Sequence, residues 1–393
     1  MYTDEIKRTS STLINEIISI RRDIHRNPEL GFHECRTSAI VSDFLKNLGF
    51  KVYTNIAKTG VVGVLEGKNP GKTIAIRADM DALPIAEEND FEYASQIKNV
   101  MHACGHDAHT AIALGAAKIL SGFRDKISGN VKFIFQPAEE GLGGAALMID
   151  EGVLENPSAD AIIALHVSPL LKSGEISIGT GPVMASPAEF DIAIYGKGGH
   201  AAQPNKSVNP ISIGVSIINM FSSIIPKTIS PFESAVLSVT SFEAGNTYNV
   251  IPSQAVIKGT VRAFDRETHN KIYNKMHSVV ASLTSLEGAD FSFDYNLGYP
   301  PVINNGEIAK LIANASKKII GEGNVKENPE PSMLAEDFSY YALKVPGAIF
   351  NLGCGNPCDE SFENLHSARF KLDESCISIG MEILSQCVLD FLR

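Results

Sequence analysis

Nine consecutive residues, 101–109 (MHACGHDAH), hold one thiol, three imidazoles and one carboxylate. Cys104 and His106 are two positions apart, and the glycine between them lets the backbone turn both side chains toward one ion. Structural zinc sites usually close with four Cys or His ligands in pairs such as C-x2-C, whereas this run holds a single Cys. The run therefore predicts part of a functional metal site whose other ligands come from elsewhere in the chain.

Two apolar, β-prone runs end in side chains that can bind metal. Residues 131–135 are followed closely by Glu139 and Glu140, and residues 161–165 lead directly into His166. Because ligands of open α/β sheets bind outside the carboxyl ends of the strands, we expect these side chains to meet. Two adjacent carboxylates can also divide the work, one binding metal while the other accepts a proton from a metal-activated water.

His366 is a further candidate ligand, since it lies in a polar loop before the last helical stretch. Taken alone, each candidate has an ordinary structural explanation, such as a buried histidine with a hydrogen-bond partner or an acidic first turn of a helix. Together, thiolate, imidazole and carboxylate form the ligand set of zinc, manganese, cobalt and nickel. The combination favours a catalytic metal site.

Motifs spread along nearly the whole chain resemble the M20 peptidase family of metal-dependent hydrolases. The resemblance is to the amidohydrolase branch, which holds N-acyl amino acid amidohydrolases, hippurate hydrolases and auxin-conjugate hydrolases. The motifs that carry it are 22–25 (RDIH), 28–31 (PELG), 77–84 (RADMDALP), 101–109, 135–140, 165–169, 196–201 and 364–368.

The resemblance implies a set of metal ligands and a general base. Two divalent ions (Mn, Zn, Co or Ni) would be held by five residues, with the thiolate bridging them: Cys104, His106, Glu140, His166 and His366. Five protein ligands for two ions leave positions open for water and substrate, as in catalytic sites. Glu139 matches the general base.

Asp79 and Asp81 are also implied as active-site residues. The wider family has a His-x-Asp pair at these positions, and Asp81 matches the residue that orients a ligand. Asp79 departs from that pattern, so we do not count it among the metal ligands, and its role is left open.

The segment 195–202 (YGKGGHAA) contains three glycines but lacks the spacing and the strand-to-helix context of a phosphate-binding loop. The resemblance instead implies that His200 reaches an active site from a lid domain, often that of a partner subunit, and stabilises the oxyanion. Asn249 and Arg262 match substrate-contacting positions. A guanidinium at Arg262 suits a substrate carboxylate, because it can bind both oxygens at once.

The order of predicted elements indicates an α/β protein of two domains. Helical periodicity dominates residues 5–48, and alternating strands and helices up to His166 predict a parallel or mixed sheet. Residues 189–295 follow a β-α-β-β-α-β order, which is typical of a ferredoxin-like domain. We therefore expect a metallopeptidase-like α/β/α catalytic domain, residues 1–183 and 298–393, with an inserted ferredoxin-like lid and dimerisation domain at 184–297.

Composition excludes several other classes of function. The chain has 393 residues, 44% of them hydrophobic and 20% charged, with a formal net charge of −11. This negative charge disfavours nucleic acid and anionic membranes as partners. The first residues lack the features of a signal peptide, and no apolar run is long enough to span a bilayer, so we expect a cytoplasmic protein. Cys354 and Cys358 form a C-x3-C pair, for which free thiols are the simplest interpretation.

The predicted activity is hydrolysis of the amide bond of N-acyl amino acids or similar small conjugates, with Glu139 as base. Alternatives within the same chemistry are an N-acetyldiaminopimelate deacetylase and a short-peptide carboxypeptidase. An alternative of another class is an inactive hydrolase scaffold that binds a conjugate without cleaving it. A homodimer through the lid domain is expected, with a self-contained monomer as the other possibility.

Overall fold

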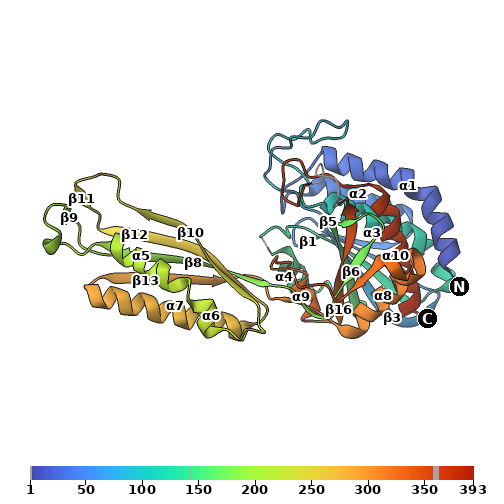
Figure 1. The fold of residues 1–393 in the computed structure, drawn as a ribbon. Helices are drawn as coiled ribbons and strands as arrows, with labels where there is room; N and C mark the ends of the chain where they lie inside the picture. The colour runs from blue at the N-terminus through green and yellow to red at the C-terminus, as the bar shows by residue number, and fades with distance from the viewer. Residues whose placement is uncertain (1, 142, 357–362) are drawn as a thin grey trace. The chain divides into compact units, whose positions relative to one another are not determined.

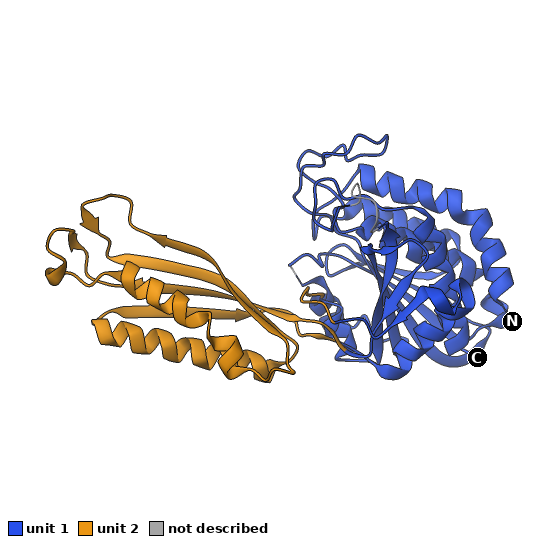
Figure 2. Cartoon of the chain, viewed as in Figure 1, with its two compact units in different colours: residues 1–181, 303–330, 337–393 blue, residues 182–302, 331–336 orange. Residues whose placement is uncertain are grey.

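The computed structural model describes residues 2–141, 143–356 and 363–393, and the chain divides into two compact units (Figure 2). Unit 1 comprises Met1–Gly181, Ile303–Glu330 and Asp337–Arg393. Unit 2 comprises Pro182–Val302 and Pro331–Glu336. Each unit has its own sheet and its own buried apolar cluster. Unit 1 is thus assembled from segments that lie on both sides of unit 2 in the sequence.

Unit 1 is an α/β structure built around a large mixed sheet (Figure 1). Its strands are β1 (Lys51–Ile56), β2 (Gly60–Glu66), β3 (Asn69–Asp79), β4 (Ser128–Gln136), β5 (Ala161–Lys172), β6 (Ile176–Ile178), β15 (Val325–Glu327) and β16 (Gly347–Gly355). In the described ranges these eight strands have the order β1-β2-β4-β3-β5-β16-β6-β15. Strands β4, β3, β5 and β16 run parallel to their neighbours in that series, while β1 and β2 are antiparallel at one edge. The predicted strands at 131–135 and 161–165 are confirmed as parts of β4 and β5.

Helices cover the central strands of this sheet. They are α1 (Thr3–Arg26), α2 (Cys35–Asn47), α3 (His106–Ser121), α4 (Gly144–Asp150), α8 (Gly306–Ile320), α9 (Ser339–Ala342) and α10 (Ser375–Phe391), with 3-10 turns η1 (Arg124–Lys126) and η3 (Glu322–Asn324). Alternate residues of β4 face opposite layers. Val131, Phe133 and Phe135 belong to the apolar cluster shared with α1, α3 and α10, whereas Lys132 reaches the turn that follows α4. The central strands therefore read as continuous apolar runs, because both faces are buried.

The helical periodicity predicted to dominate residues 5–48 is confirmed, and it is divided between the two helices α1 and α2. The break contains Pro28 and Gly31, and prolines and glycines end helices. The interruption places Glu29 and Glu34 between the helices, and both make contacts described below.

Unit 2 contains an antiparallel sheet and two main helices. Its strands are β8 (Ser186–Tyr195), β10 (Ala235–Ala244), β12 (Gln254–Ala263) and β13 (Asp290–Leu297), in the order β10-β12-β8-β13. The helices are α5 (Pro210–Phe221), α6 (Ile224–Thr228) and α7 (Arg266–Glu287), with a 3-10 turn η2 (Pro204–Lys206). Short pairs are formed by β9 (Gly199–His200) with β11 (Val250–Ile251) and by β7 (Gly181–Met184) with β14 (Val302–Asn304). The main strands and helices follow the β-α-β-β-α-β order predicted from the sequence.

The side-chain pattern of unit 2 explains its layers. Phe190, Ile192 and Ile194 of β8 are buried with residues of α5 and α7, while Glu189 is exposed on the other face. The carboxylate of Asp265 caps α7 by accepting from the Thr268 N–H at 2.7 Å. One apolar face and one polar face are what a sheet covered by helices on one side requires.

None of the helices in the described ranges combines the length and the apolar character needed to cross a lipid bilayer. Cys354 is buried near the end of β16 with a free thiol, whose pKa burial raises to about 12. Cys358, the other member of the C-x3-C pair, lies outside the described residues.

Candidate metal centre

The first two predicted ligands are positioned by the turn that begins α3. Gly105 has φ 84° and precedes the first helical residue, His106. A Cβ atom at Gly105 would lie 2.4 Å from Cγ2 of Val167 in β5, so any other residue would have to displace the Val167 side chain. The glycine thus allows the turn, as the sequence predicted, and it also brings Cys104 close to β5.

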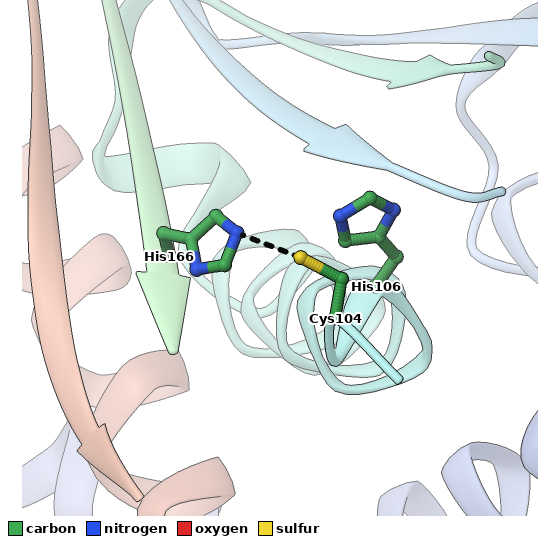
Figure 3. A group of neighbouring side chains, drawn as sticks. All are labelled: Cys104, His106 and His166. Carbon is green, nitrogen blue, oxygen red and sulfur yellow. Dashed lines mark hydrogen bonds between the residues drawn. The ribbon is translucent and has the colours of Figure 1, made fainter. Parts of the chain in front are cut away.

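The structure brings all five predicted ligands together. Sγ of Cys104 lies 3.5 Å from Nε2 of His166 (Figure 3), and Nε2 of His366 lies 3.2 Å from Oε1 of Glu140. Two groups of possible ligand atoms, each within 4.8 Å of one another, share the thiol: Cys104 with His106 and His166, and Cys104 with Glu140 and His366. This arrangement suits two ions on either side of one sulfur atom.

His106 and His166 each present one nitrogen for a metal. Nδ1 of His106 lies 3.2 Å from Oδ1 of Asp81, while its buried Nε2 makes no hydrogen bond to any described residue. His166 donates from Nδ1 to its neighbour's carbonyl, the O of Val167, at 2.8 Å, and burial lowers the pKa of His166 to about 3. Nδ1 of each ring is thus occupied by a hydrogen-bonding group, which leaves Nε2 as the nitrogen that can bind a metal.

Cys104 is buried, and burial raises the pKa of its thiol well above the ordinary value. Metal ions bind the thiolate, so an ion entering here must displace the thiol proton. Nε2 of His106, which has no hydrogen-bond partner among the described residues, and a thiol shared by two groups of donors fit divalent metals of the zinc, manganese, cobalt and nickel type.

The two adjacent glutamates follow the end of β4, as predicted, but they form a turn rather than a helix start. Glu139 is buried, and one of its carboxylate oxygens lies within 4.8 Å of a possible ligand atom of His106 and of Glu140. Asp81 supports this turn, since its Oδ2 accepts from the Glu140 N–H at 3.0 Å. Asp81 therefore contacts the ring of one predicted ligand, His106, and the backbone of another, Glu140.

His366 arrives from the far end of the chain. Its backbone has φ 65°, and its N–H donates to the O of Ala103 at 2.9 Å, next to Cys104. The exposed imidazole meets Glu140. This contact brings the polar loop next to the other predicted ligands.

Asp79, whose role the sequence left open, is buried and engaged by two cationic or donor groups. Its carboxylate accepts from Arg77 NH1 and from His109 Nδ1, both at 2.6 Å, and its Oδ2 lies 3.8 Å from Nε2 of His106. Burial alone would raise the pKa of Asp79, but His106, His109 and Arg77 lower it well below the usual range. The residue is an ionised carboxylate beside the ligands.

A buried hydrogen-bond network next to these ligands was not predicted from the sequence. Arg77 donates to Asp79, to Oε1 of Gln136 at 2.8 Å and to Oδ1 of Asp337 at 2.9 Å. Gln136 in turn donates from Nε2 to Asp337 at 2.8 Å. The only sequence signals were a charged residue inside an apolar strand and a third imidazole, His109, in the 101–109 run. Nothing in the sequence around Asp337 indicated its place.

Unit 2 holds the other three predicted site residues, and only two of them lie together. His200 pairs with Val250 between β9 and β11, and the O of Asn249 accepts from the Ala201 N–H at 3.0 Å. Nδ1 of His200 accepts from the Ala202 N–H at 3.1 Å, so Nε2 carries the proton. Arg262 lies at the other end of β12, where NH1 donates to Oγ1 of Thr260 at 2.6 Å and burial lowers the pKa of Arg262.

Comparisons with known proteins agree with the motifs. Residues 75–390 match the model of Peptidase family M20/M25/M40. The N-acyl-L-amino acid amidohydrolase of Geobacillus stearothermophilus is 44% identical over 308 residues, covering 78% of this chain and 83% of that protein. Thermostable carboxypeptidase 2 of Saccharolobus solfataricus is 39% identical over 381 residues, covering 96% and 95%.

A solved structure with high similarity is that of the Bacillus subtilis YXEP protein, described as a dinuclear metal binding peptidase from the M20 family. It matches with a TM-score of 0.84 and 33% identity, covering 97% of this chain and 99% of that one. The resemblance predicted from the motifs is confirmed: the chain belongs to peptidase family M20/M25/M40 and is a hydrolase acting on amide bonds.

Proposed function

We propose that the protein is a metal-dependent amidohydrolase that cleaves the amide bond of N-acyl amino acids or similar small conjugates. The observation that carries this proposal is the pair of donor groups that share the Cys104 thiol. We assign the catalytic domain to residues 1–183 and 298–393, and the lid and dimerisation domain to residues 184–297.

Five residues would hold two divalent ions (Mn, Zn, Co or Ni): Cys104, His106, Glu140, His166 and His366. When bound, the ions would polarise the substrate carbonyl and lower the pKa of water toward neutrality. The description of the Bacillus subtilis relative as dinuclear supports this number of ions. Asp81 orients His106 and the Glu140 backbone through the contacts given above.

Glu139 is the general base of the proposed reaction. Its buried carboxylate lies beside His106 and Glu140 without being needed as a ligand. It accepts a proton from the attacking water and passes that proton to the departing amine. His200 serves as the donor to the oxyanion, because its protonated Nε2 is free of the Ala202 contact.

The separation of site residues within unit 2 supports a homodimer with shared sites. Gln254 of β12 pairs with Tyr195 near β9, whereas Arg262 pairs with Pro187, close to where the chain enters unit 2. Eight residues of strand separate these positions by about 26 Å. An extended N-acyl amino acid is only about 10 Å long, so it cannot contact both ends of one unit 2. We therefore infer that Arg262 binds the substrate carboxylate, while His200 and Asn249 of the partner subunit act on the same substrate.

A short-peptide carboxypeptidase is the second candidate function, favoured by the name of the Saccharolobus solfataricus relative. Both substrate classes have an amide bond next to a free carboxylate, so Arg262 suits either one. The acyl group is what differs between them.

The test is amine release from N-acetyl, N-benzoyl and indoleacetyl amino acids and from short peptides. Chelator-stripped protein would be assayed with added manganese, zinc, cobalt or nickel. Metal-dependent turnover of the N-acyl amino acids supports the proposal, and a preference for peptides favours the carboxypeptidase. Two bound ions without turnover of any substrate would point instead to a protein that binds conjugates without cleaving them.

Glu139→Ala is the matching test of the mechanism. Metal content should be unchanged, while activity falls by about 10²–10⁴-fold. Mixing His200→Ala with Glu139→Ala subunits should restore part of the activity if sites are shared. A mixture that stays inactive would argue for self-contained sites.

A further inference from the structure

A continuous series of buried hydrogen bonds joins Asp79 to the predicted ligand His166. His109 is at its centre, between the Asp79 carboxylate and the backbone of Val167. We infer that His109 is a positioning residue, which fixes the orientation of His166 through the Val167 peptide and is itself fixed by Asp79. This inference rests on the proposed role of His166 as a metal ligand.

The hydrogen bonds determine the protonation of the His109 ring. Its Nε2 lies 2.9 Å from the backbone N of Val167, and a peptide N–H can only donate. Nε2 is therefore the acceptor, and the ring proton resides on Nδ1, which donates to Oδ1 of Asp79 at 2.6 Å. With both nitrogen atoms engaged, His109 has no lone pair to offer a metal, although it lies in the same group of side chains as Asp79 and His106.

The geometry of the sheet explains why Val167 needs this acceptor. The parallel register between β3 and β5 ends at Arg77 opposite Ala164, so β5 continues beyond the last residue paired with β3. A buried peptide N–H without a hydrogen-bond partner destabilises the folded state. Nε2 of His109 supplies the acceptor at this point.

The backbone of Val167 and the ring of His109 both contact His166. The O of Val167 accepts from Nδ1 of His166 at 2.8 Å, which leaves Nε2 of His166 directed at Cys104 (Figure 3). The rings of His109 and His166 are also in contact, with centroids 4.6 Å apart at an interplanar angle of 71°. The plane of the ligand ring is thus held from its edge and through its Nδ1–H.

Asp79 is held firmly enough to impose the protonation of His109. Its second oxygen accepts from Arg77, and its backbone O accepts from Oγ1 of Thr110 at 2.9 Å. These groups are all buried, where hydrogen bonds to charged groups are strong. In this arrangement an aspartate at position 79 serves the metal site without binding an ion.

Two substitutions separate the two halves of the His109 contact. In His109→Gln the amide oxygen can take the place of Nε2 and still accept from Val167. In His109→Asn the shorter amide lies near the former Nδ1 and can still donate to Asp79, but the Val167 N–H loses its acceptor. Metal affinity would be measured by competition with a chromophoric chelator, and cobalt loading by the thiolate-to-cobalt absorption of Cys104.

We expect His109→Asn to weaken the binding of at least one ion by about 10-fold or more, as for other residues that support a metal ligand. The Gln variant should bind more tightly than the Asn variant, and kcat/KM should follow the same order. Wild-type affinity for both ions in a folded Asn variant would overturn the inference. Wild-type protein that binds no metal would instead overturn the proposed function.

A measurement on the unmodified protein covers the case in which the Asn variant does not fold. Two-bond 15N–1H spectra of protein labelled in its histidines report which ring nitrogen carries the proton, and the Gln variant identifies the His109 signals. A proton on Nδ1 of His109 is expected. A proton on Nε2 is incompatible with the bond to Val167 and would refute the positioning role.

Discussion

Glu34 accepts a hydrogen bond from the backbone N–H of Ala138 at 2.9 Å, one residue before the proposed general base Glu139. Ala138 has φ 55°, a left-handed conformation that costs a non-glycine residue about 1 kcal/mol or more. The other oxygen of Glu34 accepts from the hydroxyl of Thr59, so the carboxylate is buried and fully engaged. Glu34 thereby stabilises a strained turn that carries the two site glutamates.

Removing this acceptor should impair catalysis. We expect Glu34→Ala to lower kcat/KM by about 10–100-fold, because the turn relaxes and Glu139 moves. Glu34→Gln keeps an oxygen for Ala138 and should recover most of the activity. Glu29 offers a matched control, since its carboxylate binds the N–H groups of Arg36 and Thr37 at the start of α2. Glu29→Ala should lower thermal stability without the loss of kcat, and equal kcat losses in both Ala variants would refute the role of Glu34.

Asp81 should affect metal affinity more than stability. Asp81→Ala removes the contacts with Nδ1 of His106 and with the Glu140 N–H, so we expect metal affinity to fall by about 10–100-fold. Chelator competition measures the change. Asp23→Ala, which removes a half-exposed partner of Arg36, is the control and should leave metal affinity unaltered.

The ion pair between His25 and Glu87 should depend on pH. Their atoms Nε2 and Oε1 are 3.2 Å apart and buried. Burial and Arg21 act to lower the pKa of His25, but Asp107 and Glu87 raise it above 6.5 overall. Because the folded-state pKa is higher than the unfolded one, the stabilisation is complete below pH 6.5 and is lost as pH rises through the folded pKa.

A double-mutant cycle with His25→Asn and Glu87→Gln, followed by chemical unfolding, tests this dependence. The coupling free energy should be about 1–3 kcal/mol below the pKa and clearly smaller roughly two pH units above it. A coupling that is constant across this range would show that His25 does not carry the charge.

Lys132 is expected to matter for stability rather than for chemistry. Its buried ammonium donates to the carbonyl oxygens of Val153, Glu155 and Pro157 at 2.8, 2.6 and 2.8 Å. Lys132→Met leaves these oxygens without their donor, and we expect a loss of about 3 kcal/mol in the free energy of unfolding. Lys118→Met, which removes a surface contact with Glu16, is the control and should change stability little.

Four of the five proposed ligands could be selected from the sequence because each has a local signature. Cys104 and His106 flank a glycine, and Glu140 and His166 follow or end apolar runs whose strand character is evident from composition. The supporting residues could not be predicted in the same way. Arg77 and Asp337 meet only because β3, β4 and the chain beyond residue 336 are neighbours in space, and the order of strands in a parallel sheet is set by long-range packing.

In the fold, too, elements with a local sequence signature could be predicted, and elements that depend on long-range pairing could not. Unit 2 could be predicted element by element, because its strands and helices alternate clearly along the chain. In unit 1, β16 was not predicted, although it forms a long parallel pair with β5. No helix or strand was predicted for residues 302–363, since a parallel partner distant in sequence has no local turn signal.

The hydrogen bond from His366 to the O of Ala103 joins two segments that are synthesised at different times. The ribosome makes Cys104, His106, Glu140 and His166 before it makes unit 2, but His366 emerges only after unit 2 has been synthesised. A growing chain therefore exposes four of the five proposed ligands long before the fifth can join them. With the proposed ligands, binding of the full metal complement must wait until His366 has been synthesised.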